Sequence, residues 1–72
     1  MDNPIITIQK PKRLKEGYDY AAKHPQFQNY SCETLEYAVV AYQQRMFIEK
    51  DLFYLGMAHY VRDLLIEKQV AA

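Results

Sequence analysis

The chain has few of the residues on which enzymes, metal sites and secreted scaffolds depend. Its 72 residues include a single cysteine, Cys32, which excludes an intrachain disulfide and a cysteine-based metal site. No apolar run approaches the roughly 18 residues of a membrane span, and no long apolar stretch follows a basic start as in a signal peptide. The acid and base residues are too sparse to predict an enzyme, so neither a cofactor nor a metal is expected. We expect a cytoplasmic protein, in the host cytoplasm if it is viral.

What the chain does have is apolar side chains. Half of its residues are hydrophobic and 14% are aromatic, while nine basic and nine acidic side chains cancel. This apolar content is too high for a disordered chain, and the length fits one small domain. A chain of this size buries little surface by itself. Because it has no disulfide or evident metal to stabilise it, we expect a homodimer with two-fold symmetry.

Residues 4–9 alternate between apolar and polar side chains. Ile6 and Ile8 are separated by Thr7 and followed by Gln9, and this period of two with β-branched residues predicts a strand. No second strand-like run follows in the chain. The strand is therefore expected to pair with the same strand of a second copy.

A first helix is expected over residues 12–24. Pro11 suits a helix start, and Pro25 disfavours helical geometry at the residue before it. Gly17 lies inside this helix and weakens it by about 1 kcal/mol relative to alanine. Phe27, in the loop that follows, is expected to pack back onto the core.

Two further helices are expected over 32–49 and 52–69. Ser31 is a favourable N-cap for the first of them. In the helix over 32–49, the spacing of the apolar residues predicts one apolar stripe, which neighbouring apolar side chains widen. A break near 50–51 is favoured, although one long rod with a weak point near Gly56 fits the same pattern.

The neutral total charge hides a basic cluster beside the predicted strand. Four basic side chains and no acidic one occur between positions 10 and 15, namely Lys10, Lys12, Arg13 and Lys15. A cluster of this kind is either a solvated helix start or a contact surface for nucleic acid. Its position beside the strand favours the second interpretation.

In this arrangement the chain resembles the ribbon-helix-helix family of DNA-binding proteins, the Arc/MetJ/CopG type. The resemblance covers about residues 5–47. It is carried by Ile6-Thr7-Ile8-Gln9-Lys10-Pro11, which looks like the family's strand, and by Ser31-Cys32-Glu33-Thr34-Leu35-Glu36-Tyr37-Ala38-Val39-Val40-Ala41-Tyr42, which looks like its second helix. The chain departs from the family in a longer loop without the usual glycine, in Lys10 at a commonly buried strand position, and in residues 51–72.

The resemblance implies a mainly α ribbon-helix-helix homodimer, with a core over 1–50 and a third, C-terminal helix in the extension over 51–72. It implies sequence-specific binding of double-stranded DNA by a transcriptional regulator, most simply a repressor. The two paired strands would enter the major groove. Ile5, Thr7 and Gln9 would contact bases there.

The same resemblance implies two further sets of residues. Phosphate contacts would come from the basic cluster and from the start of the second helix: Lys10, Lys12, Arg13, Lys15, Tyr30, Ser31 and Cys32. The dimer core would consist of apolar side chains from the strand and the first two helices: Ile6, Ile8, Leu14, Tyr18, Leu35, Val39, Tyr42 and Met46.

A second hypothesis comes from the C-terminal helix. Residues 52–66 are apolar on more than one face and have to be covered. They either enlarge the core or bind a protein partner, as in an adaptor, an inhibitor or an antitoxin-like protein. If the chain is a partner binder, Tyr60, Val61 or Leu64 is essential, whereas Thr7 and Gln9 are dispensable.

Overall fold

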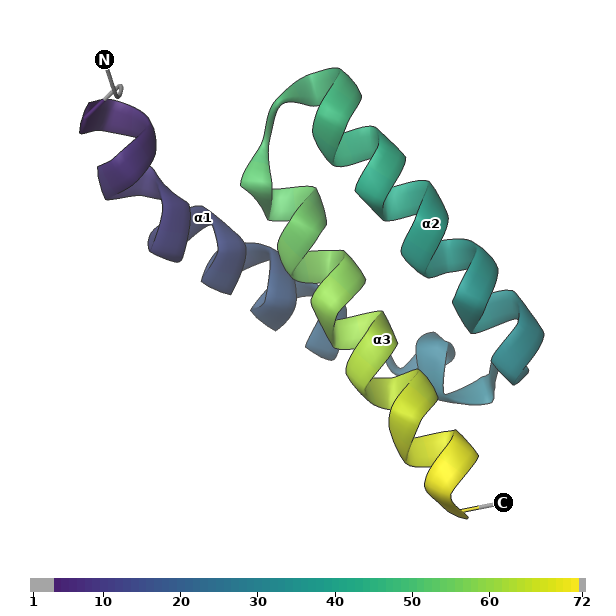
Figure 1. Cartoon of the computed structure of the whole chain (residues 1–72). Helices are drawn as coiled ribbons and strands as arrows, with labels where there is room; N and C mark the ends of the chain where they lie inside the picture. Colours follow the sequence, from purple (N-terminus) through teal and green to yellow (C-terminus); the bar gives the residue numbers. More distant parts are fainter. Residues whose placement is uncertain (1–3, 72) are drawn as a thin grey trace.

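The computed structural model describes the backbone of residues 4–71 and the side chains of residues 12–71. In this part of the chain α1 (Pro4–Ala22) is followed by a short 3-10 helix, η1 (Pro25–Asn29), and then by α2 (Cys32–Glu49) and α3 (Leu52–Ala71). Figure 1 shows α3 in the middle, with α1 and α2 packed against it. α1 and α3 run in the same direction, and α2 runs the opposite way.

The predicted strand is wrong. Residues 4–9 belong to α1, and no strand occurs anywhere in residues 4–71. A solitary strand leaves its backbone groups without partners inside the chain, whereas a helix pairs its own N–H and C=O groups. Isoleucine and threonine lower helix propensity by less than about 1 kcal/mol each, so a short alternation of them does not exclude a helix. The chain therefore lacks the strand of the ribbon-helix-helix fold, and that fold assignment is wrong.

The capping residues predicted the structure better than the alternation of residues 4–9 did. α2 begins after Ser31, whose Oγ accepts a hydrogen bond of 3.1 Å from the backbone N–H of Thr34, as its N-cap role predicts. The helix ends before Lys50, which has a left-handed φ of 54°. The Oδ1 atom of Asp51 then accepts a hydrogen bond of 3.0 Å from the N–H of Phe53 at the start of α3. The break near 50–51 is confirmed, and the alternative of one long rod is wrong.

The first helix is longer than expected at its N-terminal end and ends two residues earlier than 24. Its contact with α3 depends on the two glycines. A Cβ atom on Gly17 would overlap the carbonyl oxygen of Phe53, and one on Gly56 would lie 2.8 Å from the backbone nitrogen of Tyr18. The two helix backbones approach this closely because neither glycine has a side chain. Gly56 is therefore a packing position and not a weak point of a rod.

The core lies where η1 and the three helices meet. Among residues 12–71 the buried hydrophobic side chains are Ala21, Phe27, Leu35, Met57, Ala58, Val61 and Leu65. As expected, Phe27 packs back onto the core, and its ring lies 5.7 Å from that of Tyr30 and 6.4 Å from those of Tyr42 and Tyr60. Leu35 and Val61, both fully buried, join α2 to α3.

Part of the predicted dimer core thus lies within one chain. Leu35 is buried against α3, while Val39 and Tyr42 pack around it. Leu14, Tyr18 and Met46 are half-buried. The side chains of Ile6 and Ile8 lie outside the described residues. Leu35, Val39 and Tyr42 of α2 therefore pack against α3 of the same chain. The sequence alone had assigned these contacts to a second copy.

Candidate protein-interaction surface

α2 carries apolar side chains on two opposite faces. The inner face, with Leu35, Val39 and Tyr42, packs against α3. The outer face presents side chains that no other described element covers: Tyr37 is 80% exposed, Val40 52%, Phe47 72% and Ile48 77%.

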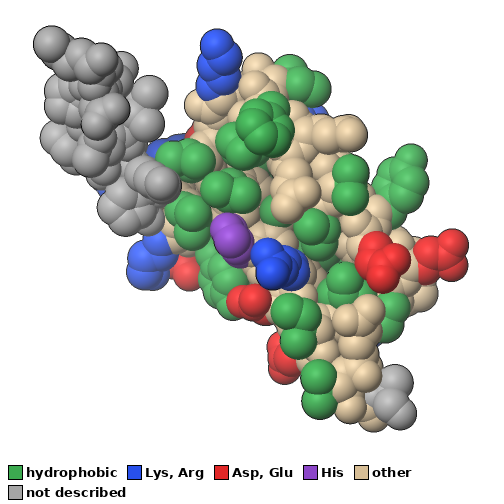
Figure 2. Space-filling model, in the orientation of Figure 1, with side chains coloured by type: hydrophobic (Ala, Val, Ile, Leu, Met, Phe, Trp, Pro, Cys, Tyr) green, Lys and Arg blue, Asp and Glu red, His purple; other side chains and the backbone are tan. Residues whose placement is uncertain are grey.

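These exposed positions recur at helical spacing. Positions 37, 40, 41, 44, 47 and 48 fall on one side of a helix with 3.6 residues per turn. We call this set the outer α2 stripe: Tyr37, Val40, Ala41, Gln44, Phe47 and Ile48. Figure 2 shows one face of the molecule, on which exposed apolar side chains lie among acidic and basic ones.

The stripe is large for so small a protein. Two aromatic and two aliphatic side chains at these exposures present on the order of 500 Å² of apolar surface. The largest apolar patch of a typical monomeric protein is about 300–600 Å² and is often functional. The stripe reaches that size on a single helix of a 72-residue chain.

The surface around the stripe is hollowed at both ends. Near the start of α2, a groove of about 460 Å³ is lined by Glu33, Glu36, Tyr37, Val40, Ala41 and Gln44. A second groove, of about 910 Å³, lies between α1 and the α2–α3 turn, where Met46, Phe47 and Leu52 form its apolar part. Phe47 belongs both to the stripe and to this second groove.

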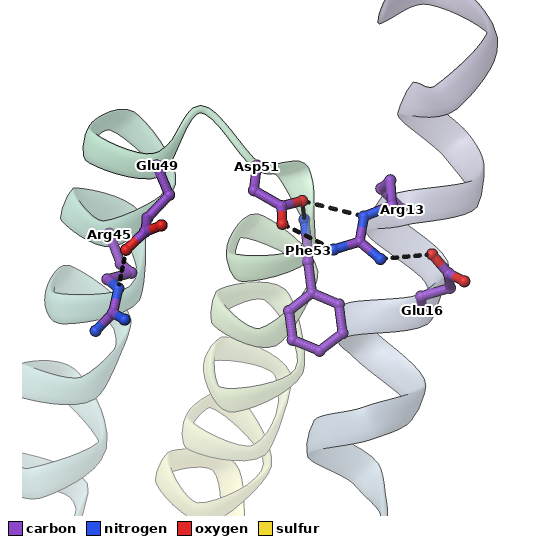
Figure 3. A network of polar contacts seen from close by, with 6 residues as sticks. All are labelled: Arg13, Glu16, Arg45, Glu49, Asp51 and Phe53. Carbon is purple, nitrogen blue, oxygen red and sulfur yellow. Dashed lines mark hydrogen bonds and ion pairs between the residues drawn. The ribbon is translucent and has the colours of Figure 1, made fainter.

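A network of charged groups joins α1 to the α2–α3 turn (Figure 3). The Nη2 and Nε atoms of Arg13 donate to the two carboxylate oxygens of Asp51 at 2.7 and 3.1 Å, and Nη1 donates to Glu16 at 3.0 Å. The Arg13 guanidinium also lies 5.0 Å from the centre of the Phe53 ring. Because Asp51 caps α3 at the same time, this network holds α1 in place against the start of α3.

The same contacts shift the pKa values of both groups. The hydrogen bonds from Arg13 and from the backbone of Phe53 lower the pKa of Asp51. The hydrogen bonds to Asp51 and Glu16 raise the pKa of Arg13. Both groups therefore stay charged at neutral pH, and the pair has a structural role in the described fold.

Two of the predicted phosphate-binding side chains form ion pairs within the chain. Arg13 is held by two carboxylates, and Lys15 pairs with Asp19 at 2.7 Å. Lys12 is exposed, and the side chain of Lys10 lies outside the described residues. Phosphate would compete with these carboxylates for the two cations, at a small cost because both ion pairs are solvent-accessible.

The N-terminus of α2 is capped by a side chain of the same chain. The Ser31 hydroxyl accepts from the N–H of Thr34 and donates to Thr34 Oγ1 at 3.0 Å. Tyr30 is exposed and Cys32 is half-buried. The predicted base contacts Ile5, Thr7 and Gln9 have side chains outside the described residues, and their backbone lies in α1. The base-reading ribbon on which these residue roles depended is absent from residues 4–71.

The predicted partner surface on the C-terminal helix is mostly inside the fold. Val61 is fully buried between the helices, and Tyr60 and Leu64 pack against the core. Val61 is therefore unavailable to a partner. The large hydrophobic side chains of α3 that are exposed are Ile66 and Val70, near its C-terminal end.

Sequence reasoning missed the outer α2 stripe. Residues 32–49 contain a second set of apolar residues at helical spacing, but both sets were interpreted from the sequence as one wide stripe. Periodicity alone does not say which of two opposite apolar faces a neighbouring helix will cover.

Neither a metal-ligand cluster nor a membrane-spanning helix occurs in the described part of the chain. No three side chains of His, Cys, Asp or Glu within it are grouped as metal ligands would be. No helix in residues 4–71 combines the length and apolar character needed to cross a membrane.

Comparison with known proteins adds no relative. No protein-family model, curated protein or solved structure matches this chain. The resemblance to the ribbon-helix-helix family is therefore not tested by any match, and the function has to be inferred from the residues themselves.

Proposed function

We propose that this chain is a non-catalytic helical module that binds a protein partner through the outer α2 stripe. The observation that carries the proposal is the exposure of Tyr37, Phe47 and Ile48 on one helix face. The proposal keeps the partner-binding hypothesis drawn from the sequence and moves its surface from the C-terminal helix to α2.

The composition of the stripe supports a protein partner. Tyrosine and phenylalanine are enriched in the buried centres of protein–protein interfaces, which are surrounded by polar rims. Here Glu33 and Glu36 flank one end of the stripe and Lys50 the other. An apolar centre between charged ends matches that anatomy.

DNA binding stays a prediction, but the ribbon mechanism is not proposed again. Arg13 and Lys15 are paired with carboxylates, and the start of α2 carries the acidic Glu33. If the chain binds DNA through its basic cluster, the logarithm of its affinity for random duplex DNA falls linearly with the logarithm of the salt concentration. We expect little such binding through this cluster, since two of its four basic side chains already have carboxylate partners.

Site-specific photo-crosslinking tests the proposed surface. A photoreactive residue is placed at Gln44, in the centre of the stripe, or at Gln69, an exposed position near the end of α3. We expect covalent adducts with protein from Gln44 and few from Gln69 when the chain is expressed in its natural cells. Equal yields from the two positions, or none from Gln44, would contradict the proposed surface.

A further inference from the structure

We infer that the partner on the outer α2 stripe is a second copy of this chain, with the two α2 helices packed antiparallel across a two-fold axis. This inference rests on the proposed function, since it names the occupant of the proposed surface. It does not depend on the strand pairing that the sequence predicted, because a helix replaces that strand.

The first argument is the amount of surface that one copy leaves uncovered. Only seven hydrophobic side chains are buried among residues 12–71, and two of these are alanines. The molecule measures 45 × 20 × 19 Å, and no fourth element among residues 4–71 packs over the outer face of α2. A second copy supplies the missing layer, as expected for a chain too short to bury a large core alone.

The second argument is the symmetry of the stripe itself. Its centre holds Ala41 and Gln44, whereas bulky side chains lie toward both ends. Rotation about this centre in an antiparallel pair places Tyr37 opposite the partner's Ile48. The small Ala41 near the axis allows the helices to approach closely, and the bulky ends fill the space on either side.

The third argument is charge, which selects the antiparallel arrangement. Glu33 and Glu36 lie at the N-terminal end of the stripe. At the C-terminal end Glu49 and Asp51 are each paired with an arginine, so Lys50 is the charge that remains there. An antiparallel pair brings the partner's Lys50 toward the two glutamates, whereas a parallel pair brings glutamates together. Antiparallel helix dipoles add to this preference.

The same acidic end argues against a membrane surface. Helices that lie on anionic membranes carry lysine and arginine beside their apolar face. α2 has Glu33 and Glu36 there, and Arg45 is paired with Glu49 at 2.9 Å.

The exposed area also suits a dimer. A stable interface covers about 800 Å² on each partner. The apolar side chains of the stripe supply on the order of 500 Å² of this. The groove between α1 and the α2–α3 turn extends the contact beyond the stripe.

Sedimentation equilibrium on the purified full chain tests the occupant. We expect a concentration-dependent dimer for the natural sequence. Phe47→Asp should weaken dimerisation at least about tenfold, since burial of one large apolar side chain contributes that much. Val70→Asp is the matched control, because Val70 is 81% exposed but lies outside the stripe. Circular dichroism establishes that both variants keep their helices. A natural chain that stays monomeric, or equal effects of the two substitutions, would overturn the inference.

Disulfide trapping tests the orientation. In a Cys32→Ser background, one chain carries Tyr37→Cys and a second, distinguishable by mass, carries Ile48→Cys. Antiparallel pairing predicts a disulfide between the two different chains. Parallel pairing gives only disulfides between identical chains, because the other combination is too far apart to bridge. That second outcome would overturn the proposed arrangement.

Charge reversal gives a third test. Lys50→Glu should weaken the dimer several-fold at low salt and less at high salt, because it faces the partner's glutamates. Lys23→Glu makes the same change of charge at an exposed position outside α2 and should have no effect. Equal effects of both variants would contradict the antiparallel contact.

Failure of this inference can be told from failure of the proposed function. A purified chain that stays monomeric while Gln44 crosslinks to a different protein overturns the second copy and leaves the proposed function standing. A monomer without adducts from Gln44 overturns both.

Discussion

The inner and outer faces of α2 differ far more in exposure than in composition. On the inner face Leu35 is fully buried, and Val39 and Tyr42 pack beside it. On the outer face Phe47 and Ile48, which are no less apolar, are 72% and 77% exposed. The difference comes from α3, which covers only one of the faces. An apolar face without a neighbour in its own chain is the strongest pointer to function in the described residues.

The largest difference between the faces is expected from truncating one side chain on each. Leu35→Ala should lower the free energy of unfolding by about 3 kcal/mol, because it leaves a cavity against α3. Val40→Ala, on the outer face, should change the stability of the monomer by less than about 0.5 kcal/mol. Urea denaturation of dilute protein measures both. Similar losses from the two variants would break the distinction between the faces.

A second prediction concerns the contact between α3 and α1, where the backbones of the two helices approach each other. Gly56→Ala should destabilise the fold by about 2 kcal/mol, because the added methyl overlaps the backbone of α1. Alanine elsewhere in a helix stabilises it relative to glycine by about 1 kcal/mol. Thermal unfolding followed by circular dichroism distinguishes the two signs, and a gain in stability would show that the helices are not in contact there.

A third prediction concerns the clamp between α1 and the start of α3. Because Arg13 and the Phe53 backbone lower the pKa of Asp51, the stabilisation by this carboxylate is present at neutral pH. It is lost as the pH falls below about 4 and the carboxyl becomes protonated.

Arg13→Gln should remove much of this acid sensitivity and cost about 1 kcal/mol at neutral pH, a small value because the pair is partly exposed. Unfolding free energies at a series of pH values provide the measurement. The contribution of the pair would be refuted by an unchanged pH profile.

The smallest effect is expected at Tyr18, whose hydroxyl donates to Asp63 Oδ2 at 2.8 Å between α1 and α3. Tyr18→Phe removes this hydrogen bond and keeps the ring, which packs edge-on against Tyr60 at 5.4 Å. The loss should be about 0.5 kcal/mol, because the bond is exposed to water. A loss as large as that of Leu35→Ala would mean that polar contacts, and not burial, hold α1 to α3.

Local signals in the sequence predicted the helix ends well. The Ser31 cap and the break near 50–51 depend on residues close together in the chain, and both are confirmed. The strand failed for the opposite reason. Alternation over a few residues is compatible with a helix, and a strand needs a partner that the sequence does not supply.

Such local signals did not predict how the helices pack against one another. Gly17 and Gly56 lower helix propensity wherever they occur, but only the fold shows that they meet the opposite helix. The basic cluster likewise suggested a phosphate surface, yet the carboxylates that pair with Arg13 and Lys15 come in part from distant positions such as Asp51. The outer α2 stripe was visible as spacing, while its exposure depended on where α3 packs.

Val39 and Val40 allow the most direct test, because Val39 packs against the core while its neighbour Val40 is 52% exposed. Methyl relaxation by a soluble paramagnetic agent can be measured for both residues across a range of protein concentrations. The account predicts that Val39 is protected throughout, and that Val40 is accessible in dilute protein and becomes protected as the concentration rises. A Val40 methyl that stays equally accessible at every concentration would contradict self-association through this face.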